Sequence, residues 1–127
     1  MGQFRISIEV ANPADGRFTP VETLVDTGAY YTMLPSSLLE SLGLTPSREM
    51  RFRVADGSAQ TWGVGQALFR IDGLETYSPV AFGPDGVFLL GAVTLEELAL
   101  IADTTNKRLV PAEEVPAVGV RLAGSDG

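Results

Sequence analysis

Hydrophobic and polar residues alternate strictly at the start of the chain. In FRISIEV, residues 4–10, every second side chain is apolar and those between are polar, which is the period-two pattern of a strand with one buried face. Similar patterns predict three more β segments: FTPVETLVD (18–26), the long hairpin MRFRVADGSAQTWGVGQALFRIDG (50–73) and TYSPVAF (76–82). The chain is therefore predicted to be mostly β-structure.

Turn residues separate these segments and indicate where the hairpins reverse. The tip of the long hairpin is expected at Asp56-Gly57, a pair favoured for the positive φ values of a two-residue hairpin turn. Further along, GPDG leads into the apolar run VFLLG (87–91). The segment ALIADTTNKRLV (99–110) then predicts a closing hairpin with its turn near Thr105-Asn106.

Helix signals occur in two short segments, PSSLLESLGL (35–44) and VTLEELAL (93–100). Each contains a hydroxyl residue followed three positions later by glutamate, which predicts a capping box at the helix start. The paired residues are Ser37 with Glu40 and Thr94 with Glu97. Gly43 is expected to end the first helix, because glycine readily adopts the left-handed conformation that follows a helix.

Length and composition favour one domain. The chain has 127 residues, 45% of them hydrophobic, which is enough for one core but too short for two ordinary domains. We expect the domain to span residues 1–112. Residues 113–127, rich in Pro, Gly and Ala, are expected to form a tail with mobile last residues, although VGVRL (118–122) is also compatible with a strand.

Two missing residue types restrict the chemistry. The chain has no cysteine and no histidine, which excludes thiolate nucleophiles, disulfides and the serine, cysteine and metal mechanisms that require imidazole. Catalysis would have to use carboxylates, hydroxyls, Lys or Arg, and we expect no metal and no cofactor. The net charge of −7, with nine scattered Lys and Arg, argues against nucleic-acid binding.

Targeting signals are not recognisable. No apolar run approaches the roughly 18–20 residues of a membrane span, and the first ten residues alternate where a signal peptide would be continuously apolar. The expectation is a cytoplasmic protein that does not bind membranes.

One carboxylate stands out. In LVDTGAYYTMLP, residues 24–35, Asp26 follows apolar residues and precedes Thr27 and Gly28. Desolvating an ionised carboxylate costs several kcal/mol unless something compensates it. The three residues could form an ordinary turn after a strand, where Asp and Gly are favoured. Alternatively, the Asp26 carboxylate takes part in a reaction.

LVDTGAYYTMLP resembles the active-site segment of retropepsin-like aspartic proteases, in which apolar residues precede Asp-Thr/Ser-Gly-Ala/Ser. FLLG (88–91) resembles their apolar-apolar-Gly element, and the hairpin between the two motifs resembles their flap. The likeness covers roughly residues 4–110 in the same order. It implies an all-β fold, a closed β-barrel of the acid-protease half type with one or two short helices and a flap hairpin.

The resemblance also implies an aspartic endopeptidase that needs no cofactor and cleaves peptides or proteins. The implied roles are Asp26 as the catalytic residue; Thr27, Gly28 and Ala29 as loop support; Ala55, Asp56, Gly57 and Ser58 as the substrate-binding flap; and Leu89, Leu90 and Gly91 as the structural motif beneath the loop. Leu89 and Leu90 would be core residues in either interpretation, and Thr27 could equally be a simple turn hydroxyl.

The mechanism of that family needs two carboxylates about 3 Å apart that share one proton and activate a water molecule. This chain has one Asp-Thr-Gly. Asp103 lacks the glycine and lies at a predicted turn. Asp15, Asp56, Asp72 and Asp85 each directly precede a glycine, as turn formers do. We therefore expect a homodimer in which Asp26 meets its own copy across a two-fold axis. The alternative is a protease-like dimer that binds peptides or assembles partners without appreciable hydrolysis.

The sequence departs from the retroviral pattern beside the motif. Tyr30 and Tyr31 stand where retroviral enzymes carry acidic residues, so a more aromatic substrate site is expected. Trp62 could either cover the cleft or pack on the sheet. Three phenylalanines are assigned to the core: Phe52, Phe69 and Phe82.

Overall fold

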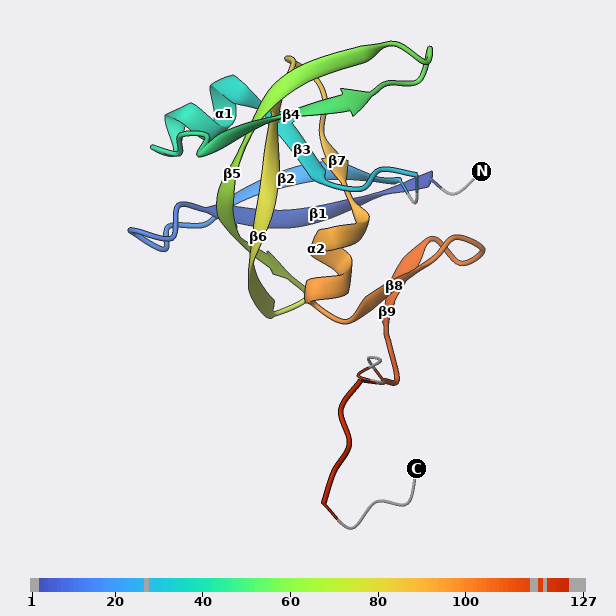
Figure 1. Cartoon of the computed structure of the whole chain (residues 1–127). Helices are drawn as coiled ribbons and strands as arrows, with labels where there is room; N and C mark the ends of the chain where they lie inside the picture. The colour runs from blue at the N-terminus through green and yellow to red at the C-terminus, as the bar shows by residue number, and fades with distance from the viewer. Residues whose placement is uncertain (1–2, 27, 115–116, 118, 124–127) are drawn as a thin grey trace.

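The computed structural model describes residues 3–26, 28–114, 117 and 119–123, and these residues form nine strands and two short helices (Figure 1). In chain order they are β1 (Gln3–Ala11), β2 (Thr19–Asp26), β3 (Thr32–Pro35), α1 (Ser36–Ser41), β4 (Arg48–Arg53), β5 (Ala59–Ile71), β6 (Leu74–Gly83), β7 (Leu89–Leu90), α2 (Ala92–Glu97), β8 (Leu100–Asp103) and β9 (Arg108–Pro111). The prediction of a β protein with two short helices is confirmed.

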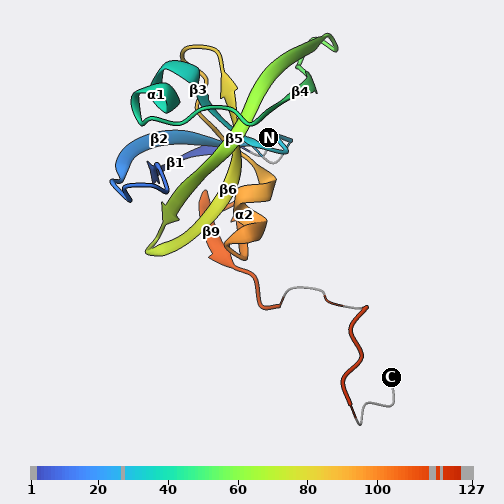
Figure 2. The same cartoon turned by 60° about the vertical axis from the view of Figure 1, so that its left-hand side comes forward.

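Seven strands form one sheet that closes into a barrel. Their order is β1-β2-β7-β3-β6-β5-β4, and β1 also pairs with β5, so the sheet returns to its first strand and β4 lies outside the closed ring. Strands β8 and β9 form a separate hairpin. Figures 1 and 2 show the β4–β5 hairpin extending at one end of the molecule and the β8–β9 hairpin at the other.

The barrel interior contains the apolar faces predicted from the alternation. In β1, Phe4, Ile8 and Val10 are buried and Arg5 is exposed. The main core also takes side chains from the other strands and both helices: Val25, Leu34, Leu39, Phe69, Ile71, Val80, Phe82, Leu90 and Leu95. The predicted core positions of Phe69 and Phe82 are confirmed.

An ion pair spans the seam where the barrel closes. Glu9 of β1 lies opposite Arg70 of β5, and the guanidinium donates two hydrogen bonds to the carboxylate, from Nε to Oε1 at 2.8 Å and from Nη2 to Oε2 at 3.0 Å. The Arg70 Cζ also lies 3.8 Å from the centre of the Phe18 ring. The hydrogen bonds from Arg70 lower the pKa of Glu9, and those to Glu9 raise the pKa of Arg70.

The tip of the β4–β5 hairpin has a longer turn than predicted. Val54 N donates to the Ser58 carbonyl at 2.9 Å, and Gly57 alone of the Asp56-Gly57 pair has a positive φ, 89°. This is a three-residue loop ending in a left-handed glycine, not a two-residue turn. The Asp56 carboxylate accepts hydrogen bonds from the Ser58 hydroxyl (2.6 Å) and amide (2.8 Å), which lower the pKa of Asp56.

Both predicted capping boxes are wrong. Helix α1 has Pro35 and α2 has Gly91 at the N-cap, and neither start has a side-chain cap. Ser37 donates its hydroxyl hydrogen to Asp85 Oδ1 at 3.3 Å instead. The predicted end of α1 at Gly43 is confirmed, with φ 83°.

The C-terminal hairpin is confirmed by the pairing of β8 with β9. At its turn, Asp103 Oδ2 accepts a hydrogen bond from Asn106 Nδ2 at 2.9 Å, and the bonds from Asn106 lower the pKa of Asp103. Asp103 is thus held in a turn as a local hydrogen-bond acceptor. The strand considered at VGVRL is not formed by its described residues, 119–122.

Three buried hydroxyl groups connect β3, β6 and α2. The Thr94 hydroxyl oxygen lies 2.6 Å from that of Thr32 and 2.9 Å from that of Ser78. Thr32 Oγ1 also accepts a hydrogen bond from Gly91 N at 3.0 Å. Helix α2 begins at Ala92, so Thr94 lies inside it and not at the cap position, and its hydroxyl joins distant segments instead.

We predict that Thr94→Val destabilises the protein by about 1–3 kcal/mol, because valine leaves buried hydroxyl groups short of a partner. Urea unfolding at fixed protein concentration measures the difference. Thr61→Val, on the exposed face of β5, is the matched control and should change stability by less than about 0.5 kcal/mol. Equal stabilities for the two variants would contradict the role of the hydroxyl cluster.

Candidate active site

Asp26 is a half-buried residue that ends β2 and begins a tight turn. Gly28 N donates to Asp26 Oδ1 at 2.9 Å, and Ala29 N donates to the Asp26 carbonyl at 3.0 Å. A Cβ atom at Gly28 would lie 3.3 Å from Asp26 Oδ1, so glycine lets the backbone amide approach the carboxylate closely. Thr27 lies outside the described residues.

Residues 29–33, which follow this turn, are held by strand β7 and by the start of α2. Strand β7 lies between β2 and β3, with Leu89 opposite both Leu24 and Met33. The next amides reach the loop itself: Ala92 N donates to the Ala29 carbonyl at 2.9 Å and Val93 N to the Tyr30 carbonyl at 3.0 Å. Backbone hydrogen bonds therefore fix the loop that carries Asp26.

Gly91 makes this arrangement possible by its lack of a side chain. A Cβ atom at Gly91 would overlap the Tyr31 carbonyl group and lie 2.7 Å from Thr32 N. Real Cβ atoms do not approach backbone this closely. The predicted structural role of the apolar-apolar-Gly segment thus has a steric basis at Gly91, while Leu90 is fully buried in the core.

Asp26 lines a cleft of about 750 Å³. One wall comes from the Asp26 loop, β3 and the segment leading into β7, and the other from the β4–β5 hairpin. The lining residues are Asp26, Gly28, Ala29, Tyr30, Tyr31, Met33, Met50, Arg51, Phe52, Arg53, Val54, Ala55, Trp62, Pro84, Val87 and Leu89. Most of these side chains are apolar or aromatic, and Asp26 alone among them carries a carboxylate.

A row of aromatic rings crosses the cleft from the loop to the hairpin. Ring centres are 5.0 Å apart for Tyr30 and Tyr31, 6.2 Å for Tyr31 and Phe52, and 5.7 Å for Phe52 and Trp62. Trp62 both lines the cleft and packs on its neighbouring strand. The assignment of Phe52 to the core is corrected, because β4 lies outside the closed barrel and presents this ring to the cleft.

The structure brings together most of the residues proposed from the sequence. Asp26, Gly28, Ala29, Ala55 and Leu89 line the cleft. The other residues predicted to form a flap, Asp56, Gly57 and Ser58, are exposed at the hairpin tip and are not among the lining residues.

The sequence interpretation did not place Arg51 and Arg53 among the residues that line the cleft; both are exposed and alternate along β4 with the half-buried Met50 and Phe52. Their signal was present in RFRV (51–54), where cationic residues alternate with apolar ones.

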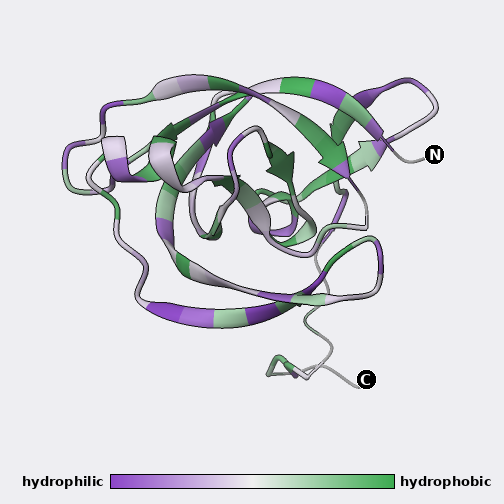
Figure 3. Ribbon diagram, turned by 90° about the horizontal axis from the view of Figure 1, so that it is seen from above, coloured by the Kyte–Doolittle hydropathy of each residue, from purple (hydrophilic) through white to green (hydrophobic). Residues whose placement is uncertain are grey.

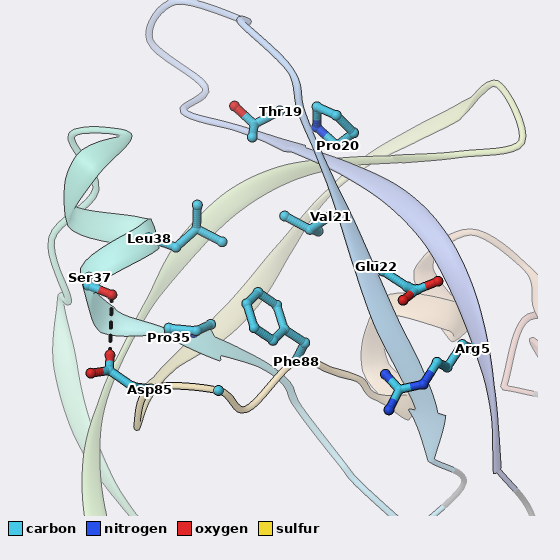
Figure 4. Close-up of a pocket in the computed structure, with 11 residues that line it drawn as sticks. Arg5, Thr19, Pro20, Val21, Glu22, Pro35, Ser37, Leu38, Asp85 and Phe88 are labelled. Carbon is cyan, nitrogen blue, oxygen red and sulfur yellow. Dashed lines mark hydrogen bonds between the residues drawn. The ribbon is translucent and has the colours of Figure 1, made fainter.

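A second hollow of about 820 Å³ shares no lining residue with the Asp26 cleft (Figure 4). Val21, Leu38 and Phe88 form its apolar part, and Arg5 and Glu22 lie at one side (Figure 4). It contains none of the residues proposed for catalysis, loop support or the flap, so the candidate active site is the cleft at Asp26.

Two further findings concern the described part of the chain. Its Asp and Glu residues form no group of three or more that could hold a metal ion. None of the helices in the same residues is long and apolar enough to cross a membrane.

The fold and the cleft thus define a barrel protein with one aspartate turn beneath a hairpin. The model of the aspartyl protease family matches residues 8–94. This match covers more than half of the chain, which therefore belongs to the aspartyl protease family. The resemblance to aspartic proteases noted in the sequence is confirmed.

Similarity to individual proteins is more distant. The solution structure of the simian foamy virus (mac) protease is similar, with 21% sequence identity and a TM-score of 0.49. The similarity covers 72% of this chain and 90% of the viral one. No curated protein matches the sequence.

We predict that Gly91→Ala destabilises the protein by at least about 1–3 kcal/mol, because the added methyl group must displace the backbone at Tyr31 and Thr32. Gly119→Ala is the matched control, since no atom lies within 4 Å of the position of its Cβ. Urea unfolding of both variants tests the steric argument. A Gly91→Ala protein as stable as the control would show that the loop accommodates a side chain there.

Proposed function

We propose that the protein is an aspartic endopeptidase that acts as a homodimer, with one Asp26 from each subunit forming the catalytic dyad. The main support is the position of Asp26. Asp26 ends strand β2 and lines a largely apolar cleft, and the described residues of its loop are held by backbone hydrogen bonds. Membership of the aspartyl protease family supports the same chemistry.

The proposed mechanism divides the work between two carboxyl groups that share one proton. The ionised carboxylate takes a proton from a water molecule, which attacks the carbonyl carbon of the peptide bond. The protonated partner donates a hydrogen bond to the carbonyl oxygen and stabilises the negative charge that develops there. Like charges this close cannot both ionise, which maintains the singly protonated state.

The need for a second subunit follows from the composition of the cleft. Of the described lining residues, Asp26 alone supplies a carboxylate. The earlier alternative, Asp103, is held in the β8–β9 turn by Asn106. A two-fold axis beside the Asp26 loop would bring two copies of the same carboxylate together.

The proposed substrate is a peptide or protein segment bound in an extended form between the Asp26 loop and the β4–β5 hairpin, which acts as the flap. Strand β4 is at the free edge of the sheet, and free edges can pair with an added strand. We propose residues 1–112 as the catalytic domain, with Thr27 supporting the loop and residues 113–127 outside the domain.

We predict that Asp26→Asn lowers peptide hydrolysis by about 10²–10⁴-fold or more, since the amide cannot act as a base. Its shape is close to that of the carboxylate, so the fold and oligomeric state should be unchanged. Asp72→Asn makes the same chemical change in an exposed turn with φ 51°, and should keep full activity. A fluorogenic peptide library measures the rates; comparable turnover by Asp26→Asn and the parent would reject the assignment.

A second prediction concerns mixed dimers. When parent chains exchange with a ninefold excess of Asp26→Asn chains, activity per parent chain should fall about tenfold, because nearly every parent chain then pairs with an inactive one. Dilution below the dimer dissociation constant should also lower specific activity. Native mass spectrometry confirms the exchange. Constant activity in confirmed mixed dimers would show that one chain holds a complete site.

A further inference from the structure

Tyr30 is an exposed aromatic residue in the loop of the proposed catalytic residue, Asp26. The residue is 67% exposed, yet its backbone is held in place, because its carbonyl accepts a hydrogen bond from Val93 N at 3.0 Å. Its ring centre lies 5.0 Å from that of Tyr31. Tyrosine is among the residue types enriched at protein interfaces. The loop thus presents a positioned aromatic ring to the outside of the chain.

The proposed dyad limits where a second subunit can lie. Two Asp26 carboxyl groups that share a proton are about 3 Å apart, so the two-fold axis passes beside this residue. Tyr30 follows Asp26 by four residues, which span at most about 14 Å. A usual interface buries about 800 Å² of each partner, a patch with a radius of roughly 16 Å. An interface of this size centred on the axis therefore includes Tyr30.

The β8–β9 hairpin presents a second apolar surface, on the same side of the barrel as the loop that follows β2 (Figure 1). Its strands carry hydrophobic residues on either side of a hydrophilic turn (Figure 3). Ala102 and Leu109 pack against the main core. Ile101 lies on the other face, since neighbouring residues of a strand point to opposite faces. It is 53% exposed and pairs across the hairpin with Val110.

The outer face of this hairpin suits contact with another copy of an acidic chain. Next to the Ile101–Val110 pair, Asp103 lies opposite Arg108, and the two side chains form an ion pair at 3.4 Å. The two cross-strand pairs together carry no net charge. Because each chain has a net charge of −7, two copies repel one another, and a neutral apolar patch is where they can approach most easily.

The hairpin also lacks support from other strands. Among the described residues, β8 and β9 pair only with each other. A sheet of two strands is marginally stable unless it packs against something else. The core covers one face, so the outer face remains available for a contact between subunits.

We infer that a second copy of the chain docks on Tyr30 and the outer face of the β8–β9 hairpin, with Tyr30 as the aromatic anchor. This inference rests on the proposed function and specifies how its dimer is held together. Retroviral enzymes carry an acidic residue where this chain has Tyr30, so the contact here depends on burial of apolar area and not on a charge at this position. Tyr30 also lines the cleft, and the second subunit therefore borders the substrate site.

Sedimentation velocity over a range of concentrations measures the dimer dissociation constant. Tyr30→Ser should raise it about tenfold or more, as loss of an aromatic anchor does, whereas Tyr30→Phe keeps the ring and most of the affinity. Ile101→Ser should raise it about three- to tenfold through lost apolar burial. The matched control is Tyr77→Ser, which removes a tyrosine that is 63% exposed on β6 and should leave the constant unchanged. Circular dichroism establishes that each variant is folded.

Two measurements on the parent chain locate the interface without a mutation. Hydrogen exchange above and below the dissociation constant should show slower exchange of β8 and β9 amides in the dimer and no change at the β5–β6 turn. Raising salt from about 0.05 to 0.5 M should lower the dissociation constant, because ions screen the repulsion between two acidic chains. A constant that rises with salt indicates an interface of ion pairs and overturns the inference.

Assembly and peptide cleavage are measured separately, so the inference and the proposed function can fail separately. If Tyr30→Ser and Ile101→Ser dimerise as the parent does, the inference is overturned and the dimeric peptidase still stands. Tyr30→Ser that raises only KM assigns Tyr30 to the substrate and also overturns the inference. Dimerisation through Tyr30 in a parent that cleaves no peptide supports the inference and overturns the peptidase function. A parent that stays monomeric overturns the inference, and cleavage by that monomer overturns the shared dyad as well.

Discussion

The close passage of Gly91 beneath the Tyr31–Thr32 backbone determines the geometry of the site. Because no side chain separates the two segments, the amides of Ala92 and Val93 reach the carbonyls of the aspartate loop, and the Gly91 amide reaches the Thr32 hydroxyl. These bonds depend on backbone position and not on long side chains. The described part of the loop is therefore tied to the barrel by backbone hydrogen bonds, which is the kind of support that a positioned carboxylate requires.

The two walls of the cleft differ in how they are supported. The Asp26 wall belongs to the closed barrel, whereas β4 is paired along one side only. Contact between the walls is made largely by aromatic side chains, with Phe52 and Trp62 from the hairpin and Tyr31 from the loop. Such contacts can slide or separate at a lower cost than breaking strand pairing. The wall that carries Asp26 is thus tied to the closed barrel, whereas the opposite wall is held by fewer strand pairings.

Local patterns were sufficient for most strands because their alternation and turn residues act over a few positions, as in β1 and the β8–β9 hairpin. They failed where distant segments decide the outcome. Thr94 has the spacing of a cap, yet its hydroxyl contacts Thr32, 62 positions away in sequence. Phe52 and Phe69 look equivalent in sequence, but closure of the barrel buries Phe69 and leaves Phe52 at the cleft. The aspartate turn was recognisable because its residues are contiguous.

The Glu9–Arg70 ion pair joins the two strands that close the barrel and stays charged in mildly acidic solution. It lies where β1 meets β5, the pairing that completes the ring. The pKa of Glu9 is below its ordinary value, so the folded carboxylate stays ionised while an unfolded one would begin to take up protons. The stabilisation is present above the unfolded pKa and is lost only as the pH falls through the lowered one. The proposed pair of Asp26 carboxyl groups would share its proton in mildly acidic solution, and there the seam of the barrel keeps its charge pair.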